Sequence, residues 1–521
     1  MSTHAEKRKT LLRLSRRQTF LLSALVGAAA GCVAVFFRLA VSSLELFRVW
    51  LSHQVQSGPL IWLALAAAGA CLGGLAAWVT QRYCREAGGS GIPHIQGVLL
   101  GLKQLRPLRL LAVKLGAGLL ALASGMSLGR EGPTVHLGGA CGSLVGSWVK
   151  APARTHKSLI AAGAGAGLAA AFNAPLAGFL FIMEELRRDM SRMTYGSALV
   201  SSVAAVAVAR LTLGQQSTFG LLDSEPIALQ RLPVVALVAL TSTLVGLAFN
   251  FGLLRVLAWR DRARKPLWVA WGALAGCLGG VFLLLCPDIT GGGHLLTEAL
   301  LSGGHGQSWL PLGLALLVVG KLLFTLLCYA TGVPGGIFAP LLTLGAMTGY
   351  GLGLFFGAWW PSLTPTPELL ATIGMAAVLT GSVRAPLTGI VLIVEMTGRY
   401  HLLYALLLAA LVAYALAERV ESEPIYESLL RRDLQRAQER WKQQTRVVEL
   451  QVGLDSQLHH VPLSRFPAHE DLLIAMIERD GKVLIPHGST VVEGGDLLTL
   501  LIGPTMDDHA LNEFMQAAKG P

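Results

Sequence analysis

Long apolar runs separated by short polar stretches make up most of this 521-residue chain. The runs lie at about 20–41, 59–80, 108–128, 134–149, 158–184, 195–213, 232–259, 267–286, 309–330, 337–360, 368–396 and 400–417. Several have the roughly 20 residues that a helix needs to cross a bilayer, and others are shorter or are interrupted by glycine and proline. Transporters place interrupted helices around sites near the middle of the membrane. The pattern therefore predicts an all-α polytopic membrane protein with broken helices.

The composition supports a membrane protein, because 53% of the residues are hydrophobic and only 14% are charged. The net charge of +11 raises the question of nucleic-acid binding. However, the basic residues cluster before the first apolar run and in the loops, as membrane topology requires. We therefore expect 1–17 to be a basic cytosolic segment, the first span to be retained, and no nucleic acid to be bound. The seven cysteines show no paired spacing, so neither a disulfide framework nor a metal site is indicated.

The chain contains an internal repeat. The stretch Lys114–Pro133 aligns with Lys321–Pro340, sharing the lysine, several leucines and glycines, and the final proline. Further along, APLAG at 174–178 matches APLTG at 385–389. Similarity by chance between apolar segments is the alternative explanation. Two structural halves that face each other across a midplane site account better for the shared lysine and the shared glycine and proline positions.

The composition changes near residue 418. Residues 419–443 are charged and end with helical spacing, and the sequence from Val447 onward is typical of a small soluble α+β unit. Strands are expected at 447–452, 482–485 and 496–502, with the turn chemistry of a hairpin at 479–482. We divide the chain into a basic segment (1–17), a membrane domain (18–430), a linker (431–446) and a cytosolic α+β domain (447–521).

The motif GREGP at 129–133 carries the first candidate site. It places Arg130 and Glu131 between two apolar runs, where ionised side chains are costly and mark function by default. Pro133 suits the first turn of a helix, and such a helix would direct free N–H groups and its positive dipole end toward an anion. The alternative is an acidic residue that only stabilises a helix N-terminus.

Two further segments resemble this one, with a glycine-rich turn and a proline at an expected helix start. They are GSGIP at 89–93 and GGIFAP at 335–340. In this order and spacing, the three motifs resemble the signature segments of the CLC family of chloride channels and chloride/proton antiporters. NAPLAGFLFIMEE (173–185) and RAPLTG (384–389) also match the family. The resemblance covers about residues 18–430 and implies the CLC fold, with two inverted halves of broken helices.

The resemblance implies a set of chloride-binding residues. The Ser90 hydroxyl and the Tyr426 phenol would contact a central chloride, together with the backbone N–H groups of Ile337 and Phe338. The neighbours of Glu131, Arg130 and Gly132, are also assigned to chloride binding. Taken alone, Ser90 could equally be a helix cap and Tyr426 an interfacial anchor. Serine within GSGIP favours chloride, because nitrate-selective members tend to have proline there.

The resemblance also assigns two acids to proton movement. Glu131 matches the gating glutamate that competes with chloride, and Glu185 matches the inner glutamate through which antiporters pass protons. Glu185 could instead be a helix-end acid that pairs with Arg187 or Arg188, and Glu184, which aligns with Glu395 in the repeat, is expected to be structural.

Two departures bear on the inner proton route. The chain has His94 and Gln96 where the familiar antiporter pattern has acids. His136 lies about one turn beyond Glu131, where it could tune that carboxylate or pack as an ordinary helix histidine.

The segment LIPHGSTVVEGGDLLTLL at 484–501 resembles the C-terminal subdomain of potassium-transport regulators, the RCK-C or TrkA-C type. Such units usually dimerise and bind small regulatory ligands. A purely structural dimerisation role and a sensing role both remain open from the sequence.

We therefore expect a non-enzymatic H⁺/Cl⁻ antiporter that acts as a homodimer in a cell (inner) membrane, with both termini in the cytoplasm. Chloride and protons are the expected substrates, the lipid bilayer is the surroundings, and no cofactor is expected apart from an unknown regulatory ligand of the tail. One alternative is a passive chloride channel gated by voltage or pH. Another is a proton-coupled cation carrier, which the N–H donors of the glycine-rich helix starts disfavour, since cation sites need oxygen ligands.

Overall fold

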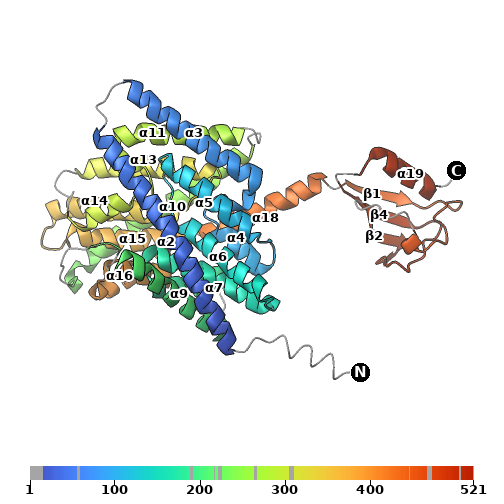
Figure 1. Cartoon of the computed structure of the whole chain (residues 1–521), viewed down its shortest axis with the longest axis horizontal. Coiled ribbons are helices and arrows are strands. Elements are labelled where there is room, and N and C mark those ends of the chain that lie inside the picture. The colour runs from blue at the N-terminus through green and yellow to red at the C-terminus, as the bar shows by residue number, and fades with distance from the viewer. Residues whose placement is uncertain are drawn as a thin grey trace. The chain divides into compact units, whose positions relative to one another are not determined.

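The computed structural model describes residues 16–54, 59–187, 192–215, 218–220, 226–262, 267–303, 310–444, 446–465, 472–503 and 506–519. The chain divides into two compact units, 1–430 and 431–521 (Figure 1). The first unit is helical. Its α-helices are α2 (Arg16–Gln54), α3 (Pro59–Tyr83), α4 (Ile92–Leu100), α5 (Pro107–Ala123), α6 (Glu131–Trp148), α7 (Ala153–Phe172), α8 (Pro175–Phe181), α9 (Arg192–Leu213), α10 (Leu232–Arg262), α11 (Leu267–Leu285), α12 (His294–Leu301), α13 (Pro311–Ala330), α14 (Phe338–Trp359), α15 (Pro367–Val383), α16 (Pro386–Thr397), α17 (Leu403–Arg419) and the start of α18 (Ile425–Gln444).

Short helical turns connect some of these elements. They are η1 (Arg85–Ala87), η3 (Leu229–Arg231), η4 (Pro287–Ile289) and η5 (Tyr400–Leu402), together with η2 (Ile182–Arg187), a π-helical turn. The predicted run at 158–184 is thus divided into α7, α8 and part of η2.

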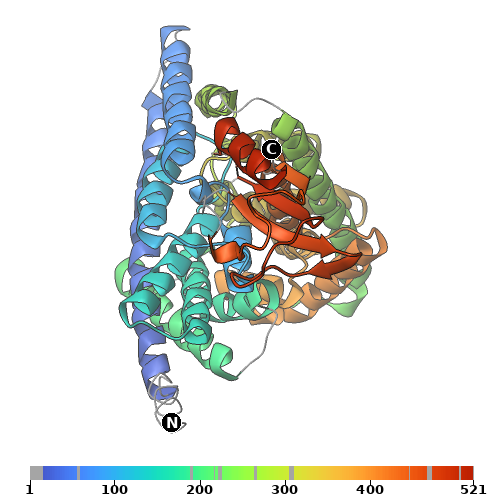
Figure 2. The same ribbon diagram turned by 90° about the vertical axis from the view of Figure 1, so that its right-hand side faces the viewer.

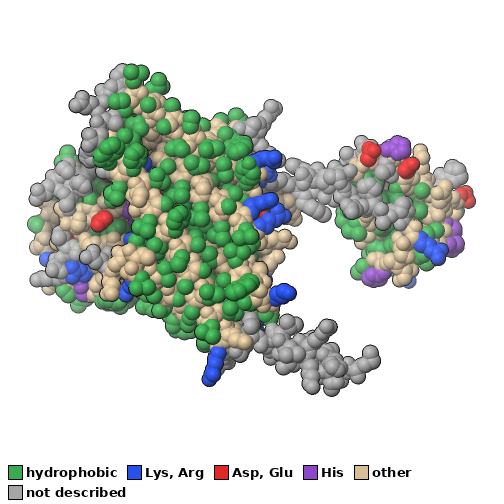
Figure 3. Space-filling model, in the orientation of Figure 1, with side chains coloured by type: hydrophobic (Ala, Val, Ile, Leu, Met, Phe, Trp, Pro, Cys, Tyr) green, Lys and Arg blue, Asp and Glu red, His purple; other side chains and the backbone are tan. Residues whose placement is uncertain are grey.

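The helical unit has the surface of a membrane protein. Within the described residues, eight helices are long and apolar enough to cross a bilayer, from Arg17–Arg48 in α2 to Tyr400–Arg419. Both views show α2 running along most of the height of this unit (Figures 1 and 2). Hydrophobic side chains cover most of the face drawn in Figure 3, and Lys and Arg side chains gather near its edges. This distribution is expected of a surface in contact with lipid.

The two halves repeat the same helix breaks. Asn173 caps the end of α7 and Arg384 caps the end of α15, both with positive φ (56° and 66°), and each cap is followed by an Ala-Pro-Leu helix start. Proline cannot continue the preceding hydrogen-bond ladder but fits a first helical turn. The break therefore begins α8 in the first half and α16 in the second. The predicted architecture of two repeated halves with broken helices is confirmed.

Two carboxylates join these short helices reciprocally. Glu184, from the first half, accepts hydrogen bonds from the backbone N–H groups of Leu387 (3.1 Å) and Thr388 (2.7 Å) at the start of α16. Glu395, from the second half, accepts the equivalent bonds from Leu176 (3.1 Å) and Ala177 (2.8 Å) at the start of α8. Each acid satisfies free N–H groups at a helix N-terminus, so Glu184 has the structural role that we expected.

Glycine allows the helices to pack with their backbones almost in contact. A Cβ atom on Gly138 would lie 2.1 Å from the carbonyl oxygen of Gly163, and one on Gly163 would lie 2.2 Å from that of Gly138. The pair Gly345 and Gly374 makes the same reciprocal contact between α14 and α15 in the second half. Small residues at membrane helix interfaces permit this approach.

The second unit is an α+β domain. Its four-stranded sheet has the order β1-β4-β2-β3, with every neighbouring pair antiparallel. The strands are β1 (Arg446–Gln451), β2 (Leu472–Arg479), β3 (Lys482–Leu484) and β4 (Leu497–Ile502), and α19 (Asp508–Lys519) follows them. Asp480 and Gly481 both have positive φ, as the expected tight hairpin requires. The stretch that we assigned to a linker forms the continuation of α18 up to Gln444.

An ion pair between the buried Asp496 and the partly exposed Arg479 stabilises this domain. Asp496 accepts hydrogen bonds from Arg479 Nε (2.7 Å) and Nη2 (2.8 Å) and from the backbone N–H of Glu493 (2.9 Å). Burial by itself would raise the pKa of Asp496, but these hydrogen bonds hold the pKa below its ordinary value. The paired geometry is the bidentate arrangement that makes Arg–carboxylate contacts strong.

Candidate functional site

The three glycine-rich motifs are joined to one another by backbone hydrogen bonds. Gly129 and Gly336 exchange two such bonds, both of 2.7 Å. Gly89 donates to the carbonyl of Val333 (2.9 Å) and accepts from Gly335 N–H (3.1 Å). Residues from the first and second halves thus form one framework, and the structure brings the three predicted segments together.

Each motif leads directly into a helix. α4 begins at Ile92, α6 at Glu131 and α14 at Phe338. The first N–H groups of a helix have no intrahelical partner, and the helix dipole adds partial positive charge there. A framework of this kind attracts an anion without placing a full cationic charge in contact with it, so the ion can also leave.

Gly132, the second residue of α6, lies at the centre of this framework. A Cβ atom there would lie 2.8 Å from Ser90 Cβ and 3.0 Å from Gly336 Cα. Only glycine allows the start of α6 to approach both other segments this closely. Gly132 therefore sets the spacing between Ser90 and the GGIFAP segment.

Ser90 is completely buried between the helix starts. Its Oγ accepts a hydrogen bond from Ile92 N–H (3.3 Å), which leaves the hydroxyl proton available to another acceptor. Its backbone N–H points to the hydroxyl of Tyr329 at 3.5 Å. The residue thus acts as a local cap and retains a donor for a ligand.

Tyr426, the second residue of α18, is also completely buried. Its hydroxyl has no hydrogen-bond partner among the described residues. The groups that interact with it electrostatically include Tyr329, Glu185 and Glu131. A buried, unpaired phenol is costly unless an ion or water completes it, which fits a ligand role for Tyr426.

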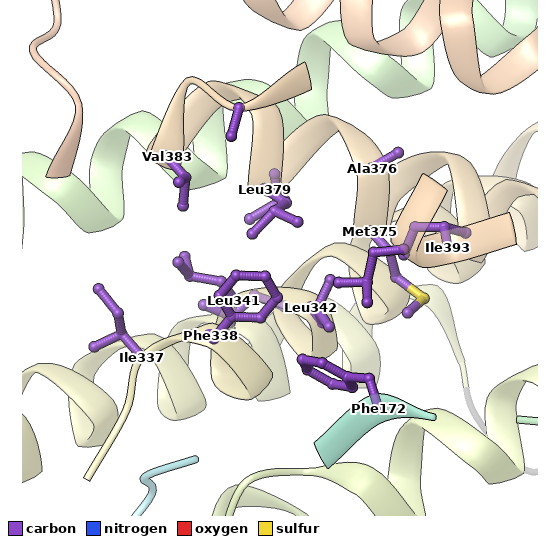
Figure 4. Packing of buried hydrophobic residues seen from close by; sticks show 14 of the residues in the cluster. Phe172, Ile337, Phe338, Leu341, Leu342, Met375, Ala376, Leu379, Val383 and Ile393 are labelled. Carbon is purple, nitrogen blue, oxygen red and sulfur yellow. The ribbon is translucent and has the colours of Figure 1, made fainter. Parts of the chain in front are cut away.

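Ile337 and Phe338 form the start of α14, and both are completely buried. Figure 4 shows Phe338 among apolar side chains from α14 and α15, and its ring centroid lies 5.5 Å from that of Phe172. The apolar packing fixes these two residues, so their backbone N–H groups have fixed positions at the helix start.

Lys114 holds the segment that precedes α4. Its ammonium group is completely buried and donates to the carbonyls of Ala87 (2.8 Å) and Gly89 (2.7 Å). Its repeat counterpart Lys321 donates to the four carbonyls of residues 288–291, at 3.2–3.4 Å. The lysines shared by the two halves therefore hold the loops that enter short helices.

Glu131, the first residue of α6, is completely buried. Its Oε1 lies 2.7 Å from His294 Nε2 and 3.7 Å from Arg130 Nε. Its Oε2 lies against Gly129, where a Cβ atom would approach to 2.5 Å. The Arg130 side chain extends toward α2 and donates to Ser42 Oγ at 3.0 Å. The carboxylate is therefore held at the helix start by one histidine and one nearby arginine.

Glu185 lies in the π-helical turn and is buried. Its Oε1 accepts a hydrogen bond of 2.8 Å from the side-chain amide of Gln96, which also reaches the Glu185 carbonyl at 3.1 Å. Gln96 comes from α4, whose first turn adjoins Ser90. The short helix α4 thus connects the surroundings of Glu185 to the anion framework. The side chains of Arg187 and Arg188, the alternative partners of Glu185, lie outside the described residues.

Comparison with known proteins agrees with this geometry. Residues 72–418 match the family described as voltage gated chloride channel. The chain belongs to this family, the CLC family. The H(+)/Cl(-) exchange transporter ClcA of Vibrio cholerae (strain ATCC 39541) is 40% identical over 423 residues, covering 79% of this chain and 89% of the relative.

Solved CLC structures have the same fold. A slow cyanobacterial Cl⁻/H⁺ antiporter has a TM-score of 0.76 and 35% identity, and the match covers 81% of this chain and 99% of the other. A CLC-type fluoride/proton antiporter has a TM-score of 0.65 and 25% identity, covering 78% and 96%. Residues 447–513 match the TrkA-C domain, as the tail sequence indicated.

The two departures from the familiar CLC antiporter pattern have definite partners. Gln96 contacts Glu185, as described above. His94 Nδ1 lies 2.9 Å from His136 Nε2, and its Nε2 lies 4.0 Å from Glu86 Oε2. Of the two roles that we considered for His136, the structure shows packing against α4, with its ring hydrogen-bonded to His94.

Sequence reasoning missed two groups in this CLC site. Tyr329 has no local signal, because it is one aromatic residue within an apolar run. His294 follows the triple glycine at 291–293, and this glycine-rich stretch, similar to that at 88–91, was the available signal. Its contact with Glu131 joins residues that are 163 positions apart, which no local pattern reveals.

Proposed function

We propose that the protein is a transporter that exchanges chloride for protons across a membrane. The observation that carries this proposal is the position of Glu131. A completely buried carboxylate occupies the first turn of α6, within a framework of helix starts suited to an anion. Because the carboxylate and chloride are both anions, they compete for the same donors. Protonation removes the charge of the carboxylate and thereby favours chloride, so proton binding and chloride binding become linked.

The chloride path would use Ser90, Tyr426 and the N–H groups of Ile337 and Phe338 as the central ligands, with Arg130 and Gly132 at the outer end. The free donor of Ser90 and the unpaired hydroxyl of Tyr426 support this assignment. Similarity to the exchange transporter of Vibrio cholerae and to the cyanobacterial antiporter supports exchange over passive conduction.

The proton path would use Glu185 as its inner group and Glu131 as the shared group. Glu185 is buried and in contact with Gln96, an amide that hydrogen-bonds the carboxylate without titrating. Glu185 therefore supplies the titratable group of this pair, and α4 connects it to the anion framework.

We further propose that the protein is a homodimer in the inner membrane, with both termini in the cytoplasm. The basic residues of the N-terminal segment support this orientation. The TrkA-C match supports a regulatory tail that binds a small ligand.

The test is a chloride gradient imposed across liposomes that contain purified protein, with internal pH followed by a dye. Wild-type protein should move protons uphill. Glu131→Gln should conduct chloride without moving protons, because its amide cannot titrate. Glu185→Gln should keep chloride movement and lose proton movement, and Glu184→Gln is the matched control for a neighbouring structural acid. Rapid chloride flux with no proton movement in the wild type would establish a passive channel instead.

A further inference from the structure

His294 is the feature of this molecule that the proposed transport cycle leaves unexplained. It is the first residue of α12, and its Nε2 lies 2.7 Å from Glu131 Oε1. The side chain of Glu131 is 0% exposed, whereas that of His294 is 11% exposed. His294 therefore contacts the carboxylate and also reaches the surface of the protein.

The loop before His294 has the same construction as the loop before α4. Gly291 and Gly293 have φ values of 60° and 84°, close to the 62° and 87° of Gly89 and Gly91. The short turns η1 and η4 precede these glycines at matching positions. In this correspondence His294 stands in the second half where Ile92 stands in the first. The second half thus brings a titratable ring to a helix start that in the first half carries an apolar residue.

The ring is held in place by its surroundings. Thr343 of α14 lies against Gly293, where a Cβ atom would meet its Oγ1 at 2.4 Å. The ring of Phe219 lies 6.1 Å from the imidazole, centroid to centroid. The ammonium group of Lys321 donates to the carbonyls of residues 288–291, which precede His294 in the same loop. The contact with Glu131 therefore belongs to a fixed structure.

The charged groups around the contact between His294 and Glu131 differ in whether they can exchange a proton with the carboxylate. Arg130 is 3.7 Å from Glu131 Oε1, and Arg38 of α2 also interacts electrostatically with Glu131. Arg48 and Glu45, also of α2, lie beside Gly291. Arginine keeps its proton at every physiological pH, so it contributes charge only. Among the described residues in contact with Glu131, His294 is the one whose side chain can both donate and accept a proton, one at each ring nitrogen.

We propose that His294 is the proton donor and acceptor of Glu131 at the end of the route opposite to Glu185. This proposal rests on the proposed antiport. When the site takes up a proton, the Nε2–H bond of His294 breaks and an O–H bond forms at Glu131 Oε1. Nδ1 takes a proton from a hydronium ion, which becomes water, so the ring stays neutral and the carboxylate becomes a carboxylic acid. The neutral acid binds the N–H groups at the start of α6 more weakly than the carboxylate does, so chloride can take its place. The reverse transfer regenerates the carboxylate and returns the proton to water.

The central test is His294→Gln in the liposome assay. A glutamine amide can still donate a hydrogen bond to Oε1, but it cannot carry a proton, so the variant separates proton transfer from positioning. We expect coupled chloride and proton movement to fall at least fivefold and its dependence on pH to flatten. Chloride binding measured by calorimetry should stay within twofold of the wild type. The control is His156→Gln, which removes a histidine of α7 that contacts Ser143.

A second pair of variants keeps the proposal falsifiable. His294→Ala should be slow, and external imidazole should restore its turnover by replacing the missing ring. In a Glu131→Ala background, His294→Gln should leave the uncoupled chloride flux unchanged, because the carboxylate that exchanges protons with His294 is absent.

The failures of the two proposals are distinguishable. If the wild type moves no protons, the proposed antiport is wrong. If the wild type pumps protons and His294→Gln pumps at the same rate with the same pH profile, the role of His294 is overturned. A slow His294→Ala that imidazole does not restore, together with a fast His294→Gln, would reduce His294 to a positioning residue.

Discussion

Replacing Lys114 by methionine tests whether the buried ammonium organises the anion site. Methionine keeps the unbranched shape and removes the charge and all three donors. In the wild type, Nζ donates to the carbonyls of Ala87 and Gly89, just before Ser90. The variant therefore releases the loop that leads into α4 without creating a large cavity.

The size of the effect follows from the two acceptors. Both bonds, at 2.8 and 2.7 Å, have the lengths of charge-assisted hydrogen bonds. A buried acceptor that loses its donor costs about 1–3 kcal/mol. The Gly89 carbonyl keeps one bond from Gly335, so the full cost applies mainly to Ala87. Removal of a buried ammonium recovers its desolvation penalty, which offsets much of the loss in overall stability.

The expected change therefore lies in the site more than in folding. A released loop must be reordered when chloride binds, and this ordering weakens binding. We expect the chloride affinity to fall at least tenfold, which corresponds to about 1.4 kcal/mol. The assay is calorimetric titration of chloride into purified protein, with size-exclusion chromatography and a thermal unfolding curve as the check of folding.

Lys321→Met is the matched control from the other half. It removes longer contacts, of 3.2–3.4 Å, from the loop before His294, so the chloride affinity should change less than threefold. If Lys114→Met is folded and binds chloride within twofold of the wild type, the reasoning is refuted. The backbone bonds of Gly89 alone would then be sufficient to hold the loop.

Three further changes test other parts of the molecule. Ser90→Pro should raise nitrate transport relative to chloride in a liposome flux assay, and unchanged selectivity in a folded variant would remove Ser90 from the ligands. Truncation after Gln444 should leave a membrane domain that folds and transports, because Tyr426 lies upstream; a folded but inactive truncation would contradict this. The low pKa of Asp496 stabilises the tail above about pH 4, and this contribution is lost as pH falls through the pKa of the folded state. Asp496→Asn should therefore lower the thermal stability of the tail at pH 7 and reduce its dependence on pH below 4.

Much of the membrane fold could be predicted from the sequence, because lipid requires long apolar helices and each break is marked by proline or glycine. The break between α7, which ends at Phe172, and α8, which begins at Pro175, illustrates this. The anion framework was also predictable, since three glycine-rich motifs precede helix starts and resemble one family. In the tail, the residues of β2 do not by themselves predict a strand, although the hairpin turn at Asp480 and Gly481 implies one before it.

Contacts between distant residues could not be predicted in the same way. The hydrogen bond from Gln96 to Glu185, and that between His94 and His136, depend on how α4 packs against η2 and α6. A sequence shows which residues can titrate or donate, but it does not show which of them meet. For this reason the sequence alone does not decide how His94 and Gln96 affect the inner proton route.

The reciprocal bonds of Glu184 and Glu395 have a consequence for how the protein is made. The backbone N–H of Leu176, at the start of α8, donates to the carboxylate of Glu395, which lies 219 positions later in the chain. At about 5–20 residues per second, a ribosome takes roughly 10–45 s to add that many residues. During this interval the N–H groups of Leu176 and Ala177 at the start of α8 lack the acceptor that they have in the folded protein. Synthesis of the second half supplies the acceptor Glu395 and, at the start of α16, the N–H donors of Leu387 and Thr388 that bond Glu184. Both reciprocal contacts therefore become possible only when the second half is in place.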